Sequence, residues 1–195
     1  IAMGLFDLRQ QLSFYGAYHH NTLNVLIHTI FVPTILFTAL VFFCPLGSLY
    51  EMEVNIPGVF ETHMHFNFPF FYVCFTGFYY IILEPVAGFS FFCLMLLMWL
   101  GASFWYATLG MKALTVALGI HVLSWIMQFV GHGVFEGRKP ALLDSLFQSF
   151  VLAPLFVWFH ILFFVGYRRG LQHDIEVNVQ KRIAEFKNAK PKSSQ

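Results

Sequence analysis

The chain has 195 residues, of which 58% are hydrophobic and only 11% are charged. Soluble domains carry about 25% charged residues, so the composition indicates a membrane protein, and the length fits one domain. The formal net charge of +1 leaves no basic stripe that could bind phosphates, which excludes nucleic acid as a partner.

Four apolar runs approach or exceed the length of about 20 residues that a membrane span requires. They cover residues 26–44, 67–83, 87–109 and 114–135. Their length, without alternation of polar and apolar residues, excludes a barrel. The sequence therefore predicts an all-α, polytopic membrane bundle with four transmembrane helices.

The positions of Lys and Arg predict the orientation of these helices. The segment 45–66 contains three Glu and no Lys or Arg, so we assign it to the outer or lumenal side. Arg9 before the first span and Arg138-Lys139 after the fourth then lie on the cytosolic side, as four crossings require.

A fifth apolar run, 146–166, contains Pro154 and has basic residues on both flanks, including Arg168-Arg169. We interpret it as a re-entrant or broken pair of half-helices, bent at the proline and returning to the cytosolic face. A fifth full span with a lumenal tail is the alternative.

The tail from 171 to 195 has apolar residues at four-residue spacing, which predicts an amphipathic helix lying on the membrane or on the protein. These residues are Leu171, Ile175, Val179 and Ile183. We accordingly divide the chain into a membrane-embedded domain, 1–170, and a cytosolic amphipathic tail, 171–195.

Nine histidines occur in this apolar chain, and helix geometry sorts them by depth. His28 lies at the cytosolic start of the first span and His132 at the cytosolic end of the fourth, so two independent assignments place them at one depth. His121 shares a helix face with His132. Eleven residues, or about 16 Å of helix, separate the two, which excludes a shared metal ion.

His19 and His20 precede Asn21, a predicted N-cap, and lie where the chain could fold over the mouth of the bundle. His173 is a further candidate if the tail helix caps the bundle. Polar residues near these histidines complete the candidate site: Asn24, Gln128, Glu136, Arg138 and Lys139.

Other interpretations of the histidines stay open. We assign His63 and His65 to surface roles in the lumenal loop, and His121 and His160 to hydrogen bonds between helices. The candidate histidines themselves could be interfacial residues satisfied by their neighbours.

A cluster of neutral imidazoles with open coordination positions suits iron, zinc or copper, and beyond it lies only membrane. An iron oxygenase or desaturase acting on an acyl chain and a zinc lipid hydrolase both fit. The HxxxH and HxxHH boxes of membrane desaturases are absent. A non-enzymatic lipid-binding protein with structural zinc is a third possibility.

Two long stretches carry a family resemblance: "GLFDLRQQLSFYGAYHHNTLNVLIHTIFVP" and "WIMQFVGHGVFEGRKPALLDSLFQSFVLAPLF", followed by "HDIE" at 173–176. They resemble a small family of membrane proteins whose fungal member is the endoplasmic-reticulum 2-hydroxy fatty acid dioxygenase. The resemblance implies an Fe(II)-dependent alpha-oxidation of 2-hydroxy fatty acids from phytosphingosine breakdown. Dioxygen is consumed, and the acid leaves one carbon shorter.

The resemblance also implies a catalytic role for the 1–170 domain in the endoplasmic-reticulum membrane, and the positions of Lys and Arg predict that the active site lies on the cytosolic side. Its implied catalytic residues are His19, His20, His28, His132 and Glu136. The four histidines are the candidate metal ligands, with either His19 or His20 joining His28 and His132, and His173 is a further ligand candidate. Asn24 and Gln128 would orient the rings, and Arg138 or Lys139 would hold the carboxylate of the substrate. The acyl tail would lie in a Phe-lined groove between spans. Zinc could replace iron in crystals.

Overall fold

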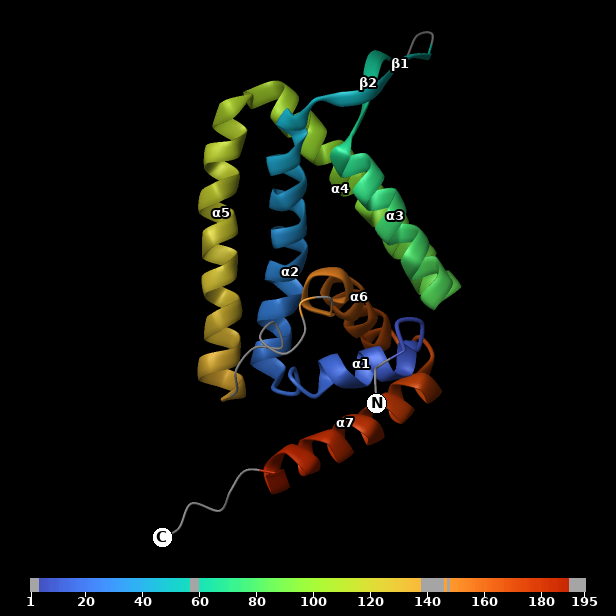
Figure 1. The fold of residues 1–195 in the computed structure, drawn as a ribbon, viewed down its shortest axis with the longest axis vertical. Coiled ribbons are helices and arrows are strands. Elements are labelled where there is room, and N and C mark those ends of the chain that lie inside the picture. Colours follow the sequence, from blue (N-terminus) through green and yellow to red (C-terminus); the bar gives the residue numbers. More distant parts are fainter. Residues whose placement is uncertain (1–3, 57–59, 138–145, 147, 190–195) are drawn as a thin grey trace. The chain divides into compact units, whose positions relative to one another are not determined.

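The computed structural model describes residues 4–56, 60–137, 146 and 148–189, except for the side chains of 51–65, 148, 187 and 189. Most of the described chain is helical (Figure 1). The chain divides into two compact units, of which unit 1 comprises Ile1–Val32 and Ile126–Gln195 and unit 2 comprises Pro33–Trp125.

Within the described residues, three helical segments are long and apolar enough to cross a membrane: Thr22–Leu46, Pro85–Leu109 and Met111–Glu136. The first joins α2 (Thr22–Phe43) to the 3-10 turn η1 (Cys44–Leu46), and the second is α4. The third joins α5 (Met111–Val130) to the π-helix η2 (Gly131–Glu136). The prediction of a mainly helical chain is thus confirmed, and these candidate spans suggest membrane association.

The fourth predicted span corresponds to α3 (Phe68–Leu83), which has 16 residues. At about 1.5 Å per residue it is about 24 Å long, which is less than the roughly 30 Å thickness of the hydrocarbon core. The count of four transmembrane helices therefore stays a prediction.

In unit 2, α3 and α4 form a helical hairpin (Figure 1). The Glu84 carboxylate accepts a hydrogen bond from the Ala87 N–H at 2.5 Å and caps α4. A Cβ at Gly88 would collide with the backbone of Tyr80, so this glycine permits the close approach of the two helices. Local capping and one small residue thus set the hairpin.

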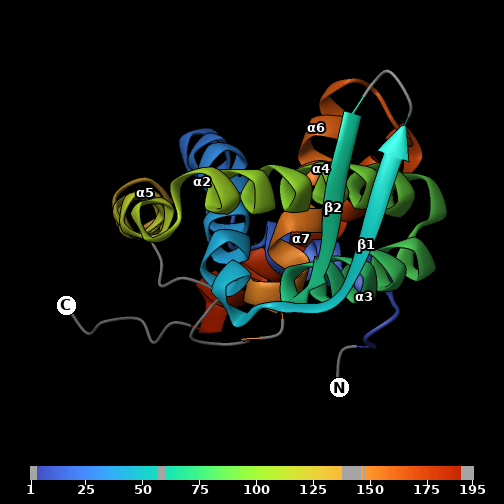
Figure 2. The same ribbon diagram turned by 90° about the horizontal axis from the view of Figure 1, so that it is seen from above.

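The segment 45–66 is not the loop that we expected, because it contains an antiparallel hairpin (Figure 2). Strand β1 (Ser48–Ile56) pairs with β2 (Phe60–Asn67). The stretch "YEMEVNI" alternates apolar and polar residues, which is the sequence signal for a strand. The surface roles assigned to His63 and His65 concern side chains outside the described residues.

His121 has the structural role that the sequence predicts. Thr38 Oγ1 lies 2.7 Å from its Nδ1, and Trp125 Nε1 donates to its Nε2 at 3.0 Å. Because Nε2 accepts, Nδ1 carries the proton and donates to Thr38. The ring links α2 to α5, and both of its nitrogens are engaged.

In unit 1, α1 (Leu8–Gly16) lies along α7 (Arg169–Ala189), as Figure 1 shows. The four apolar residues of the tail pattern are all buried: Leu171, Ile175, Val179 and Ile183. The predicted amphipathic helix is confirmed, and it packs on the protein. The boundary expected at residue 170 stays a prediction.

The fifth apolar run forms the short π-helix η4 (Gln148–Leu152) and the 12-residue α6 (Ala153–Phe164). Pro154 lies in the first turn of α6, where its missing N–H removes no helical hydrogen bond. The proline therefore marks the start of a helix, and the two parts are unequal in length. Whether the run re-enters or spans stays a prediction.

Candidate metal centre

Three histidines of unit 1 converge from different parts of the chain. His19 follows α1, His28 lies in α2 and His132 lies in η2, and each is at most 4% exposed. One nitrogen of each ring lies within 4.8 Å of the others, and the ring centroids are 4.2 to 4.8 Å apart. Nitrogens that bind one ion at about 2 Å lie within about 4 Å of each other, so the three histidines form a group that could hold a metal ion.

Backbone carbonyls fix the orientation of two of these rings. His19 Nδ1 lies 2.8 Å from the Tyr15 carbonyl oxygen, and His28 Nδ1 lies 2.9 Å from that of Asn24. A carbonyl oxygen can only accept, so each Nδ1 carries the proton and each Nε2 presents a lone pair. This is the tautomer that metal-binding histidines adopt when a carbonyl holds the other nitrogen.

The buried Nε2 of His19 is the atom that most directly indicates a metal. It has no hydrogen-bond partner among the residues that the structure describes. Buried polar atoms of native proteins are almost always satisfied, so an exception requires an explanation such as an ion. The donor set therefore fits a transition metal such as iron or zinc.

The environment of His19 keeps its ring neutral. Burial, together with the proximity of His28 and His132, lowers the pKa of His19 well below its usual value. The Tyr15 ring stacks on His19 with centroids 4.1 Å apart and an interplanar angle of 5°. A neutral, sterically held imidazole can bind a metal without first losing a proton.

The buried Glu136 carboxylate joins the end of η2 to the start of α2. It accepts hydrogen bonds from the N–H groups of His20 and Asn21, at 3.2 and 3.1 Å, and from Asn24 Nδ2 at 2.9 Å. An acidic group is favoured at a helix N-terminus, where backbone N–H groups lack partners. Asn21 Oδ1 accepts from the N–H of Leu23 at 2.9 Å, in keeping with the predicted cap.

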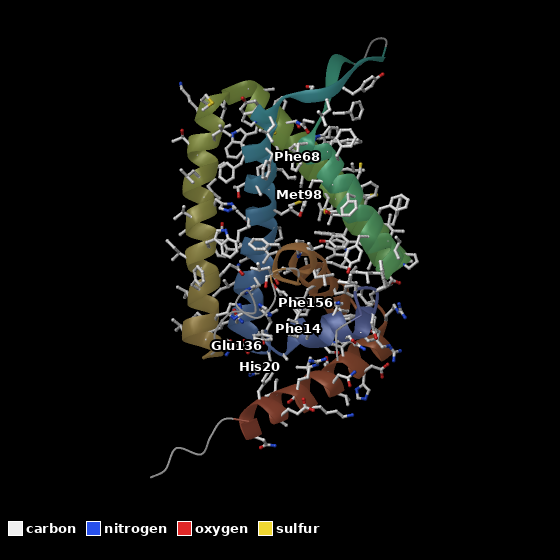
Figure 3. The ribbon with its side chains drawn as sticks, in the orientation of Figure 1. Phe14, His20, Phe68, Met98, Glu136 and Phe156 are labelled. Atoms are coloured by element: carbon white, nitrogen blue, oxygen red, sulfur yellow. The ribbon has the colours of Figure 1, made fainter. Side chains whose placement is uncertain are left out.

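The side chain of His20 does not belong to the cluster of His19, His28 and His132. Its side chain is 45% exposed, and its Nδ1 contacts Glu136, which Figure 3 labels beside it. His173 is exposed on α7, and the structure does not bring it to the histidine cluster. Gln128 is buried one turn before His132. Arg138 and Lys139 lie outside the described residues.

Sequence reasoning missed a cavity of about 410 Å³ beside His19. His19, His20 and His160 line it together with phenylalanines of α6 and one face of α7. The Nδ1 of His160 lies 3.2 Å from the carbonyl oxygen of Phe156 in its own helix, whereas we expected a hydrogen bond to another helix. The spacing of Phe156, His160 and Phe163 along one helix face is the signal that could have revealed this wall.

Comparison with known proteins identifies the family of this chain. Residues 5–165 match the family described as "2-hydroxy-palmitic acid dioxygenase Mpo1-like". The chain belongs to the Mpo1-like family. It is 43% identical over 178 residues to "2-hydroxy-palmitic acid dioxygenase MPO1" of Saccharomyces cerevisiae. The aligned region covers 89% of this chain and 92% of the yeast protein. No solved structure shows a significant match.

The Mpo1-like match confirms the family that the two long motifs predict. The matched range contains all three clustered histidines, Glu136 and most of the cavity wall formed by α1 and α6. Homology to a named dioxygenase supports an oxidoreductase with a role in fatty acid alpha-oxidation. The histidine cluster supplies a group that could hold a metal ion.

A substitution at Gly131 would test how closely η2 packs on α2. A Cβ at Gly131 would collide with Asn24 Oδ1 and would lie 3.6 Å from His28 Cε1. We expect Gly131→Ala to weaken metal binding by about 10- to 100-fold, because it displaces groups that support the ligands. Titration of metal-stripped protein, with detection of bound metal, measures this loss.

Gly133→Ala is the matched control in the same π-helix, because a Cβ there has no atom within 4 Å. Both variants make the same change in helix propensity. The Gly133 variant should bind metal like the wild type, and equal affinities for the two variants would contradict close packing at Gly131.

Proposed function

We propose that this chain is an Fe(II)-dependent dioxygenase that shortens 2-hydroxy fatty acids by one carbon. The observation that carries the proposal is the buried Nε2 of His19, which lacks a partner in the described part of the chain and lies beside His28 and His132. The name of the yeast relative supports the substrate, since that protein is called a 2-hydroxy-palmitic acid dioxygenase.

In this proposal the metal is held by His19, His28 and His132. Ferrous iron bound by these imidazoles would supply the redox chemistry that dioxygen requires, which zinc lacks. Three protein ligands leave coordination positions for other groups. His20 and His160 line the same cavity as His19.

The remaining residues of the site orient the ligands. Tyr15 and Asn24 hold the rings of His19 and His28 through their backbone carbonyls. Glu136 holds the turn after α1 and the start of α2 through three N–H donors. We propose that Glu136, which the family resemblance implies as catalytic, is a positioning residue.

The proposed reaction needs no further reductant. The C1–C2 bond of the 2-hydroxy acid breaks, C1 leaves as carbon dioxide, and C2 becomes the carboxyl carbon of the shorter acid. This is a four-electron oxidation of the substrate, and it matches the four-electron reduction of one dioxygen molecule. One water is released, so atoms and electrons balance.

We also propose a location in the endoplasmic-reticulum membrane and a role in phytosphingosine breakdown. Three long apolar helices support membrane association. Arg9 and the basic residues of the tail support a cytosolic orientation of the site, because Lys and Arg favour that side.

Metal replacement tests the reaction. Protein stripped of metal and reloaded with Fe(II) should convert 2-hydroxypalmitic acid to the acid one carbon shorter only in the presence of oxygen, whereas the Zn(II) form should be inactive. Product analysis by mass spectrometry and an oxygen electrode measure the two quantities. Zinc found in purified protein is weak evidence, since such sites bind zinc more tightly than ferrous iron.

The opposite result would indicate the zinc lipid hydrolase. Oxygen-independent cleavage of a lipid ester by the zinc form, with no product from the 2-hydroxy acid under iron and air, would overturn the dioxygenase proposal.

A further inference from the structure

We propose that the cavity bounded by α1, α6 and α7 binds the acyl chain of the 2-hydroxy fatty acid, with α7 as one of its walls. The inference rests on the proposed function and adds the place where the substrate tail lies. It differs from the groove between spans that the sequence led us to expect.

The size and lining of the cavity suit an acyl chain. Its volume of about 410 Å³ falls within the range of about 300–1,000 Å³ found for small-molecule sites. The apolar part of its lining is aromatic and aliphatic: Leu12, Phe156, Phe159, Phe163, Ile175 and Val179. Such a lining favours a hydrocarbon tail over a polar ligand.

The cavity connects the histidine cluster to the molecular surface. His19, which is 3% exposed, lines it together with Phe164, which is 93% exposed at the end of α6. A substrate whose carboxylate and hydroxyl lie near His19 can therefore extend its tail past the aromatic residues of α6. Figure 3 labels Phe156 on this helix.

Helix α7 supplies the opposite wall. Ile175 and Val179 belong to its buried stripe and also line the cavity. Gly16 of α1 permits the close approach of α7, because a Cβ there would lie 2.8 Å from Val179 Cγ2. Gln172 donates to Glu176 at 2.8 Å on the flank of this stripe, where the cavity meets water.

Phe163 is the residue best placed to report on chain length. It is half-buried, lines the cavity and lies one turn after Phe159 on α6. Phe163→Trp narrows the cavity and Phe163→Ala widens it. One methylene in an apolar pocket changes kcat/KM by about 10- to 200-fold, so a blocked pocket should discriminate strongly by length.

The first experiment compares 2-hydroxy acids of twelve and sixteen carbons with the iron-loaded enzyme. The quantity compared is kcat/KM for the sixteen-carbon acid divided by kcat/KM for the twelve-carbon acid. Phe163→Trp should lower this ratio by at least about tenfold. Phe163→Ala should leave that ratio at or above the wild-type value. Ile161→Trp is the matched control, because Ile161 is exposed on the same helix and does not line the cavity; its ratio should equal that of the wild type.

The second experiment needs no variant and no turnover, so it remains decisive if a variant fails to fold. A 2-hydroxy fatty acid with a diazirine at its terminal carbon is irradiated with wild-type protein, and the labelled peptides are sequenced. Label on α6 or α7 supports the inference, even if iron-dependent turnover is absent and the proposed function fails. Label confined to α3 or α4, or an unchanged length profile in folded, active Phe163 variants, overturns it and leaves the dioxygenase proposal standing.

Discussion

Replacing His28 or His132 by alanine is expected to remove bound metal and to abolish turnover, while the protein still accumulates in the membrane. Each variant loses one of three imidazoles whose nitrogens lie within 4.8 Å of each other. Two remaining donors bind a divalent ion far more weakly than three, because metal affinity depends on the number of deprotonated ligands. The imidazoles are neutral ligands, so removing one leaves no buried charge unpaired.

Metal analysis of protein purified without chelators, combined with oxygen-dependent turnover, checks this expectation. Metal content should fall by at least about tenfold, and activity should fall to background. His19→Ala should behave in the same way. His173→Ala is the control, since His173 is exposed on α7; it should keep both metal and activity. Full metal occupancy in the His28 and His132 variants would contradict the proposed ligand set.

The proximity of His28 and His132, whose ring centroids lie 4.8 Å apart, agrees with the common depth that helix rise and basic flanks predict. The sequence could not predict which of His19 and His20 belongs to the histidine cluster. These two residues lie in a turn outside regular helix, so periodicity gives their side chains no direction. Contacts decide instead: the carbonyl of Tyr15 fixes His19, and the carboxylate of Glu136 faces His20.

Hydropathy located the long helices because a run of about 20 apolar residues is a strong signal in a sequence. It did not reveal the β1–β2 hairpin, whose signal is alternation, nor the cavity beside α6, whose walls come from distant segments. The apolar pattern of α7 predicted a buried face. That pattern does not tell which element packs against the buried face of α7. The structure shows that α1 covers Val179.

Glu136→Gln is expected to weaken metal binding without removing a ligand. The carboxylate of Glu136 is fully buried, and its two oxygens accept from two backbone N–H groups and from Asn24 Nδ2. A glutamine side chain has only one acceptor oxygen, and its NH2 group would face one of these N–H donors without forming a hydrogen bond to it. Hydrogen bonds to charged groups contribute about 1.5–3 kcal/mol each, so the free energy of unfolding should fall by about 2 kcal/mol or more. Metal affinity should fall by about 10- to 100-fold, as for other groups that orient ligands.

Excess iron separates a positioning role for Glu136 from a ligand role. Because the three imidazoles remain in Glu136→Gln, a high concentration of Fe(II) should restore both occupancy and turnover. The same concentration should not rescue His28→Ala, which lacks a donor. Glu185→Gln, an exposed change on α7, controls for the lost charge and should match the wild type. If excess iron fails to fill the Glu136 variant while its fold is intact, Glu136 binds the metal directly and its assignment as a positioning residue is wrong.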